Sequence, residues 1–514
     1  GFKLGAVQVV GPFLVAVTVF FTTLVAERLL PEDRRVARLG ALLVAVSPFM
    51  IGLAGAYMNH VTAAAFGTMA IYFALRARDG HIAWAIPTGA SLAWAFGTRP
   101  LSGLVFGAVV AFGAWAVRDG RGGFAVSPWL RRVGLATFGA APLVLALAAY
   151  NHHFFGSAFR FGYSISHGET TSLGFHRDPW GNSYGPIEAI AYTSTDLLAL
   201  SLNLLETPVP VVVVVGAFLM SSRRLASGER ILAAWALLPV LANVFYWHHG
   251  LFMGPRMLNE VAPAWGVLTS VAAVGLVRSV PERWKVLRGG YSLRVALGTF
   301  LLIGGGIGFA VLAPQRLVSY GGEWQASTRF EVPEAEEPLL IFVHGGWTAR
   351  VGMRLAAHGM RLDSVETALR QNGTCKVHHF VDAYPRLQTS PSVDQAALDF
   401  EARSSGFPSE FEISPGNRIR VEEGGRMSEA CLREIHADRH GIFDVTPLLW
   451  QGDLPGLPTR GALLVRDMGP VMNDALIRRF PDRRPMVLRT PDPSADPVLE
   501  QYEMAMAVLW GGPN

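Results

Sequence analysis

Polar side chains able to bind an anion gather in the short connections between long apolar runs of this 514-residue chain. Tyr57, Asn59 and His60 share one connection, and Arg99 lies in another that is three residues long. Guanidinium groups bind phosphate and carboxylate oxygens strongly, and an ionisable group near membrane depth usually serves a site. We therefore predict an anion-binding role for Arg99, with His60 beside it. The alternative is that Arg99 only extends to lipid phosphate at the membrane surface.

A second set of such residues follows later in the chain. Arg256 occurs in a Gly-Pro-Arg turn, four residues before Glu260, and we predict that Arg256 also binds an anion. The alternatives are a turn residue for Arg256 and a favourable helix N-terminal charge for Glu260. We predict that the remaining polar residues contact an acceptor molecule. These residues are Asn151, His152, His248 and Glu260.

The connection predicted over residues 151–196 is unusually long, and such loops are usually functional. It contains Asp178 and Glu169, either of which could take a proton as a general base, although solvent-facing acids are also natural there. Paired histidines at 152–153 and 248–249 leave a divalent metal open, but no acidic cluster has ligand spacing, so we predict no metal ligands.

The elements that must position these residues are membrane-spanning helices. Of the residues, 51% are hydrophobic, and the mean hydropathy is +0.31. Apolar runs of this length indicate helices that cross a bilayer. We predict a mainly α polytopic bundle of about ten spans, at 7–24, 39–53, 61–75, 82–97, 101–117, 133–150, 208–220, 231–246, 261–277 and 293–312.

The orientation of the bundle follows from its basic residues. One alternate set of connections holds 18 Lys and Arg residues, and the other set holds four. The basic set should be cytoplasmic. The polar candidates above then lie outside, as do the first residue and everything after the last span. An outside N-terminus without a signal peptide suggests that one upstream helix is missing. The basic residues serve topology, so we expect no nucleic-acid partner.

The chain changes character near residue 313, beyond which its composition is that of a polar globular domain. We predict a membrane domain at 1–313 and an extracytoplasmic α/β domain at 314–514. Its strands are expected at 339–343, 462–466 and 486–489, with a helix at 471–480. Cys375 and Cys431 both fall here, and an oxidising compartment favours one disulfide between them. The alternative is two unpaired buried cysteines.

Several stretches resemble bacterial members of the GT-C superfamily of integral membrane glycosyltransferases, which use lipid-phosphate sugars and include relatives of protein O-mannosyltransferases and aminoarabinose transferases. The stretches are 47–49 (SPF), 55–60 (GAYMNH), 96–100 (FGTRP), 150–151 (YN) with 155–159 (FGSAF), 254–256 (GPR) with Glu260 and Pro263, and 465–469 (VRDMG).

The resemblance implies a polyprenyl-phosphate sugar donor, an external site and inversion at the anomeric carbon. The acceptor would be a glycan, lipid or protein, and the location the bacterial inner membrane. It also implies a catalytic aspartate in a first external loop, which this sequence lacks. Arg99 and Arg256 would then bind the donor phosphate with Tyr57 and Asn59. His60 would be a catalytic residue that acts as a hydrogen-bond donor. Two other classes remain open: a lipid or sugar transporter or flippase, and a non-catalytic envelope assembly protein.

Overall fold

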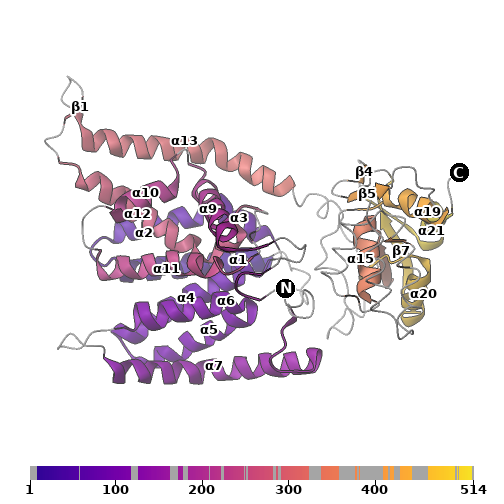
Figure 1. Cartoon of the computed structure of the whole chain (residues 1–514), viewed down its shortest axis with the longest axis horizontal. Helices are drawn as coiled ribbons and strands as arrows, with labels where there is room; N and C mark the ends of the chain where they lie inside the picture. Colours follow the sequence, from indigo (N-terminus) through magenta and orange to yellow (C-terminus); the bar gives the residue numbers. More distant parts are fainter. Residues whose placement is uncertain are drawn as a thin grey trace. The chain divides into compact units, whose positions relative to one another are not determined.

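The computed structural model describes most of the chain. Up to residue 322 it covers 9–56, 58–116, 125–162, 172–176, 183–207, 209–220, 225–247, 249, 253–281, 285–286 and 291–322. Beyond that it covers 337–357, 360, 377–378, 381, 409–414, 417–421, 429–442, 461–491, 495 and 497–511. The chain forms two compact units, and the described residues of the second begin at Gly322 (Figure 1).

Unit 1 is almost entirely helical. Its α-helices are α1 (Val10–Leu29), α2 (Arg34–Ala45), α3 (Pro48–Gly55), α4 (His60–Asp79), α5 (Ala85–Thr98), α6 (Pro100–Ala108), α7 (Val126–Phe155), α9 (Pro186–Asn203), α10 (Val211–Met220), α11 (Ser227–Asn243), α12 (Ala262–Ser279) and α13 (Leu293–Gly322). Tighter or wider turns form η3 (Ile82–Trp84), η4 (Val109–Ala114) and η6 (Arg256–Val261), and a short hairpin joins β1 (Lys285–Val286) to β2 (Tyr291–Ser292).

Several of these helices are long and apolar enough to cross a membrane, so the chain is a multi-pass membrane protein. Among the described residues, four helices satisfy both criteria, namely Val10–Leu29, Val126–Phe155, Arg256–Ser279 and Leu293–Tyr320. The pair α2 and α3, bent by 44°, makes a fifth if it counts as one span. Pro100–Ala114 and Val211–Met220 are apolar but shorter. The predicted total of ten spans stays a prediction.

The bend between α2 and α3 follows from the local sequence. Ser47 caps α3 by accepting a hydrogen bond from the amide of Met50, and Pro48 occupies the first helical turn. Proline disfavours helical geometry in the residue before it, so a helix usually ends there. One predicted span therefore becomes two helices.

Three boundaries differ from the sequence prediction. Helix α7 runs on to Phe155, and α9 begins at Pro186, so the predicted loop 151–196 is helical at both ends. Helix α13 continues past residue 313, where we placed the domain boundary, and ends at Gly322. Apolar side chains are exposed along α13, including Leu302 and Val318. The hydropathy pattern located the apolar centre of each helix, but it did not predict the polar residues at the helix ends.

Helices α5 and α7 cross closely because glycine lies at their contact. A Cβ added to Gly89 would come within 1.7 Å of the Ala136 carbonyl oxygen. One added to Gly139 would come within 2.0 Å of the Ile86 carbonyl oxygen. Small residues at such crossings let membrane helices approach until their backbones touch. Figure 1 shows α4, α5 and α7 side by side.

Replacing Gly139 by Val should separate α5 from α7, because the new side chain would overlap a backbone carbonyl that cannot rotate away. Overpacking of this kind costs about 1–3 kcal/mol. The measurement is thermal unfolding of the detergent-solubilised chain by circular dichroism. Gly134→Val is the matched control, since a Cβ at this α7 position meets no described atom within 4 Å. Equal melting temperatures for the two variants would contradict the packing argument.

Unit 2 contains a four-stranded sheet with helices around it. The strands are β3 (Leu339–Val343), β6 (Ala462–Arg466), β7 (Arg484–Arg489) and β8 (Val498–Gln501), in the order β6-β3-β7-β8. The three predicted strands and the predicted helix are confirmed, the helix as α20 (Pro470–Arg479). The unit also holds α15 (Trp347–Ala357), α19 (Glu429–Asp438), α21 (Tyr502–Trp510) and a hairpin of β4 (Ser409–Ser414) and β5 (Asn417–Val421).

The central strand β3 is parallel to both neighbours, and its alternating side chains enter two cores. Leu340 and Phe342 pack with α21, and Ile341 packs on the opposite face with Ile442. In the β3–β6 register Val343 is opposite Arg466, so the residues that follow the two strands emerge side by side. These are His344 and Asp467.

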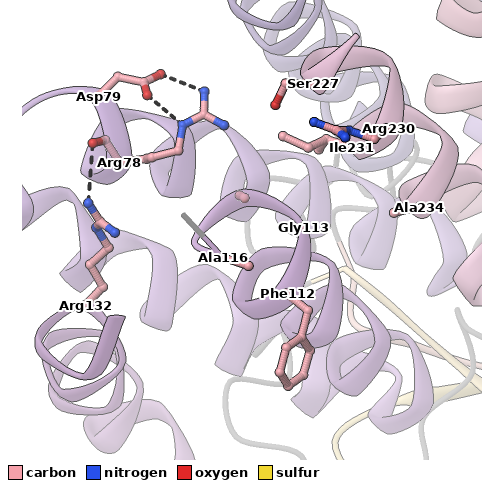
Figure 2. Close-up of a pocket in the computed structure, with 11 residues that line it drawn as sticks. Arg78, Asp79, Phe112, Gly113, Ala116, Arg132, Ser227, Arg230, Ile231 and Ala234 are labelled. Carbon is pink, nitrogen blue, oxygen red and sulfur yellow. Dashed lines mark hydrogen bonds and ion pairs between the residues drawn. The ribbon is translucent and has the colours of Figure 1, made fainter. Parts of the chain in front are cut away.

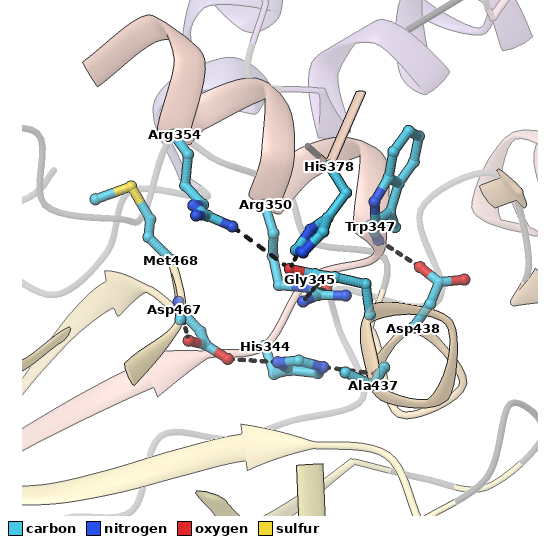
Figure 3. Close-up of polar contacts among 12 residues, drawn as sticks. His344, Gly345, Trp347, Arg350, Arg354, His378, Ala437, Asp438, Asp467 and Met468 are labelled. Carbon is cyan, nitrogen blue, oxygen red and sulfur yellow. Dashed lines mark hydrogen bonds and ion pairs between the residues drawn. The ribbon is translucent and has the colours of Figure 1, made fainter. Parts of the chain in front are cut away.

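A buried polar cluster therefore forms at the carboxyl ends of β3 and β6 (Figure 3). The ring of His344 hydrogen-bonds to the Asp467 carboxylate, and both side chains are fully enclosed. Burial alone would raise the pKa of Asp467, but the hydrogen bond and charge of His344, with the charge of Arg350, hold it at about 2. Arg350 pairs with Glu434 at 2.8 Å, also buried. The His344–Asp467 contact therefore joins the ends of β3 and β6 inside the fold.

The predicted disulfide lies partly outside the described residues. The backbone of Cys431 belongs to α19, whereas Cys375 is not among the residues that the structure describes. The pairing stays a prediction.

Candidate functional site

Arg99 occupies the corner between α5 and α6. It is the C-terminal cap of α5 and the N-terminal cap of α6, and its backbone is extended because Pro100 follows. Asn59, one residue before α4, donates to the carbonyl of Thr98 at 3.2 Å. This contact holds the start of α4 next to the corner at Arg99. The predicted phosphate-binding residues Asn59 and Arg99 therefore lie close together.

The guanidinium of Arg99 is held from three sides. Its Nε atom lies 3.1 Å from Oε1 of Glu260, Nη1 contacts the His60 ring, and Nη2 lies 3.2 Å from the sulfur of Met257. An arginine side chain has five N–H donors, so three such contacts leave two N–H groups for a ligand. The Arg99 side chain is 14% exposed, so part of it remains accessible.

Glu260 positions Arg99 from within the bundle. Its side chain is 3% exposed, and its Oε1 atom also accepts a hydrogen bond from Ser102 at 2.9 Å. The indole of Trp235 donates to the Glu260 backbone carbonyl at 3.1 Å. We assigned Glu260 to the acceptor on sequence alone. That assignment stays a prediction, and the enclosure of Glu260 and its ion pair show that its side chain holds Arg99 in place.

Arg256 lies close to this cluster at the start of η6. The turn before it is unusual, since Met253 and Gly254 have φ values of 55° and 82°. A Cβ at Gly254 would also meet the Tyr320 hydroxyl at 3.0 Å, so glycine is required for both conformation and space. Arg256 is half-buried and within electrostatic range of Arg99. Two guanidinium groups within electrostatic range of each other form an arrangement that suits an anion.

A second cluster, which the sequence analysis missed, joins α9 to the segment after α11. His249 Nδ1 lies 2.5 Å from Oδ2 of Asp196, and the two side chains are 6% and 3% exposed. The other ring nitrogen of His249 lies 3.2 Å from the Tyr184 hydroxyl, which donates to the Val244 carbonyl at 2.8 Å. A histidine oriented by a buried carboxylate is the arrangement of a general base.

The end of α11 connects the two clusters. Asn243 donates to the carbonyl of Met257, the residue whose sulfur contacts Arg99. The next residue, Val244, supplies the carbonyl that holds Tyr184. Asn243 therefore lies beside the cluster around Arg99, and its neighbour Val244 lies beside the Asp196–His249 pair.

The other predicted site residues are separate or not described. Asn151 is buried on α7 and donates to the carbonyl of Ala158, so it stabilises the turn after that helix. His152 is exposed on α7, and within the described chain neither residue contacts Arg99. Four candidates lie outside the described residues, namely Tyr57, Glu169, Asp178 and His248. Their roles stay predictions.

The described residues contain no group of three or more His, Cys, Asp or Glu side chains that could hold a metal ion. Among the same residues, His152 and His153 are exposed on α7, and His249 bonds to Asp196.

No protein-family model and no curated protein matches the sequence. Two solved structures show a distant likeness, both of ArnT from Cupriavidus metallidurans. The structure bound to undecaprenyl phosphate has a TM-score of 0.37 and 13% identity, over 65% of this chain and 68% of that one. The apo structure has a TM-score of 0.36 and 14% identity, over 65% and 67%.

Proposed function

We propose that the chain is a GT-C glycosyltransferase that transfers a sugar from a polyprenyl-phosphate donor to an extracytoplasmic acceptor with inversion. The observation that carries the proposal is the Arg99 guanidinium, fixed by a buried carboxylate and close to a second arginine. Both arginines come from connections that the distribution of basic residues assigns to the non-cytoplasmic side.

The chemistry follows from the leaving group. When the anomeric carbon separates from the donor, negative charge develops on the phosphate oxygens. Arg99 and Arg256 would stabilise that charge, and donors that are fixed in advance need no reorganisation during the reaction. Glu260 and Ser102 hold Arg99 in place, and the His60 ring borders its Nη1 atom.

Inversion requires a base that takes the acceptor's proton as the new bond forms. We propose the Asp196–His249 pair for this step among the described residues. Asp196 would orient the ring and stabilise its charged form. The other ring nitrogen would accept the proton once the acceptor hydroxyl takes the place of Tyr184 beside it. Asp178 and Glu169 remain the alternative bases.

The experiment supplies the purified full chain in proteoliposomes with radiolabelled polyprenyl-phosphate sugars and an extract of envelope acceptors. Release of polyprenyl phosphate together with label in the acceptor fraction would support the proposal. Arg131→Gln is the matched control, because this exposed arginine lies near the start of α7, away from the site. Movement of intact donor across the bilayer without cleavage would contradict transfer and identify a flippase.

A further inference from the structure

A cavity lies at the opposite end of α4 from His60. Its volume is about 750 Å³, and it is lined by residues of α4, η4, α7 and α11 together with Ala116 (Figure 2). Arg78 and Asp79 of α4 form one wall, and Arg230 of α11 lies across from them. The Arg99 cluster lies at the start of α4, so the two sites are separated by the length of a 20-residue helix.

The cavity holds three guanidinium groups and one carboxylate. Arg78 forms two hydrogen bonds with Asp79, of 2.6 and 3.0 Å. Arg132 donates to the carbonyls of Ala77 and Arg78. In the described structure, Arg230 has neither a hydrogen bond from its side chain nor an ion pair. One carboxylate cannot neutralise three guanidiniums, so the cavity has the charge that attracts an anion.

The remaining wall is apolar and irregular. Phe112 and Gly113 belong to η4, a π-helical turn that continues α6. Such turns are rare and frequently occur at functional sites. Ile231 and Ala234 of α11 line the same space. An anion bound here would therefore contact both arginine and hydrocarbon.

Tryptophans mark this end of the bundle as a membrane interface. Trp129 donates to the Ala111 carbonyl and packs near Phe112. The guanidinium carbon of Arg76 lies over the Trp84 ring, 4.6 Å from the centre of that ring. Amphipathic tryptophan rings concentrate at headgroup level, and this end carries the basic connections. The cavity thus opens where cytoplasmic-leaflet headgroups lie.

We propose that this cavity binds the phosphate headgroup of an anionic lipid from the cytoplasmic leaflet. Arg230 and Arg132 would contact the phosphate oxygens from two helices, since a guanidinium fork matches phosphate geometry. Phe112 and Ile231 would contact the start of an acyl chain. Basic pockets between membrane helices on the cytoplasmic side suit such lipids. This site is independent of the proposed transfer reaction.

The test uses the full chain in phosphatidylcholine nanodiscs with a trace of photoactivatable phosphatidylglycerol. Cross-linked peptides are mapped by mass spectrometry, and labelling is titrated with unlabelled phosphatidylglycerol. We expect labelling within residues 112–116 and 227–234, and Arg230→Gln should weaken competition about tenfold, as loss of one charge-assisted contact would. Arg131→Gln is the matched control, because this exposed arginine lies beside Arg132 but does not line the cavity.

Three outcomes would overturn the proposal. One is labelling spread over all lipid-facing helices, and another is an equal effect of the two variants, since either indicates general attraction to anionic lipid. The third is full competition by soluble glycerol phosphate at millimolar concentration, which would indicate a site for a water-soluble phosphate. Circular dichroism melting of both variants shows that each remains folded.

Discussion

Arg99→Ala should reduce the rate of sugar transfer about 100- to 1,000-fold, the loss seen when one fixed donor to a developing oxyanion is removed. Arg99 is the guanidinium most firmly held in the site, with contacts to Glu260, Met257 and the His60 ring. The measurement is the single-turnover release of polyprenyl phosphate at saturating donor, which isolates the chemical step from binding.

The alanine variant alone is ambiguous, because it leaves the Glu260 carboxylate buried without its partner. Breaking such a pair costs about 3–5 kcal/mol of stability. Two further variants separate folding from chemistry. Arg99→Lys retains the charge but loses the planar fork, and Arg99→Ala combined with Glu260→Gln removes the orphaned charge. Wild-type transfer by either of them would disprove a catalytic role for the Arg99 guanidinium.

His249→Gln should slow transfer about 100- to 10,000-fold, the usual contribution of a general base. Asp196→Asn should also slow transfer, because the amide can no longer orient the ring or stabilise its charged form. The readout is the rate measured as a function of pH. A positioning role would lower the plateau and leave the profile's shape unchanged, whereas loss of the base removes the acidic limb of the profile.

His153→Gln is the matched histidine control, because this exposed residue lies at the end of α7 and contacts neither cluster in the described structure. A wild-type rate in His249→Gln would rule out the pair as base. It would return attention to Asp178 and Glu169, whose substitution by Asn and Gln can be assayed in the same way. The proposed donor would be unaffected by that result.

The position of Arg99 could be predicted from the sequence because neighbouring residues determine it. Pro100 ends α5 and extends Arg99, and a short connection between apolar runs must lie near the membrane surface. The pairing of Arg99 with Glu260 could not be predicted. The two residues are 161 positions apart, and their contact depends on how η6 packs against α4 and α11.

Asp196 was missed because α9 was interpreted as loop. A signal for the helix was present: Pro186 is at its first turn, and the Glu188 side chain accepts from the Gly185 amide at 2.9 Å. Polar residues along α9 hid this signal from hydropathy. His249 was missed for the same reason. Without α9, the prediction contained no carboxylate partner for the histidines at 248–249.

The polar core of unit 2 shows the limit of motif interpretation. The sequence His344-Gly345-Gly346 after a strand is similar to the oxyanion loop of α/β-hydrolases, a weak signal without a nucleophile elbow. The structure gives His344 another role, as the partner of Asp467 inside the fold. Strand positions were predictable, but the parallel order that places β3 beside β6 was not.

The buried contact between Arg99 and Glu260 has an evolutionary consequence. A lineage that loses either residue first passes through a chain with an uncompensated charge in its interior, which most marginally stable proteins do not survive. Change at these two positions is therefore expected to be coupled, with both charges kept or both lost together. Ser102, which shares the carboxylate, should be replaced only in the lineages where the pair has already gone.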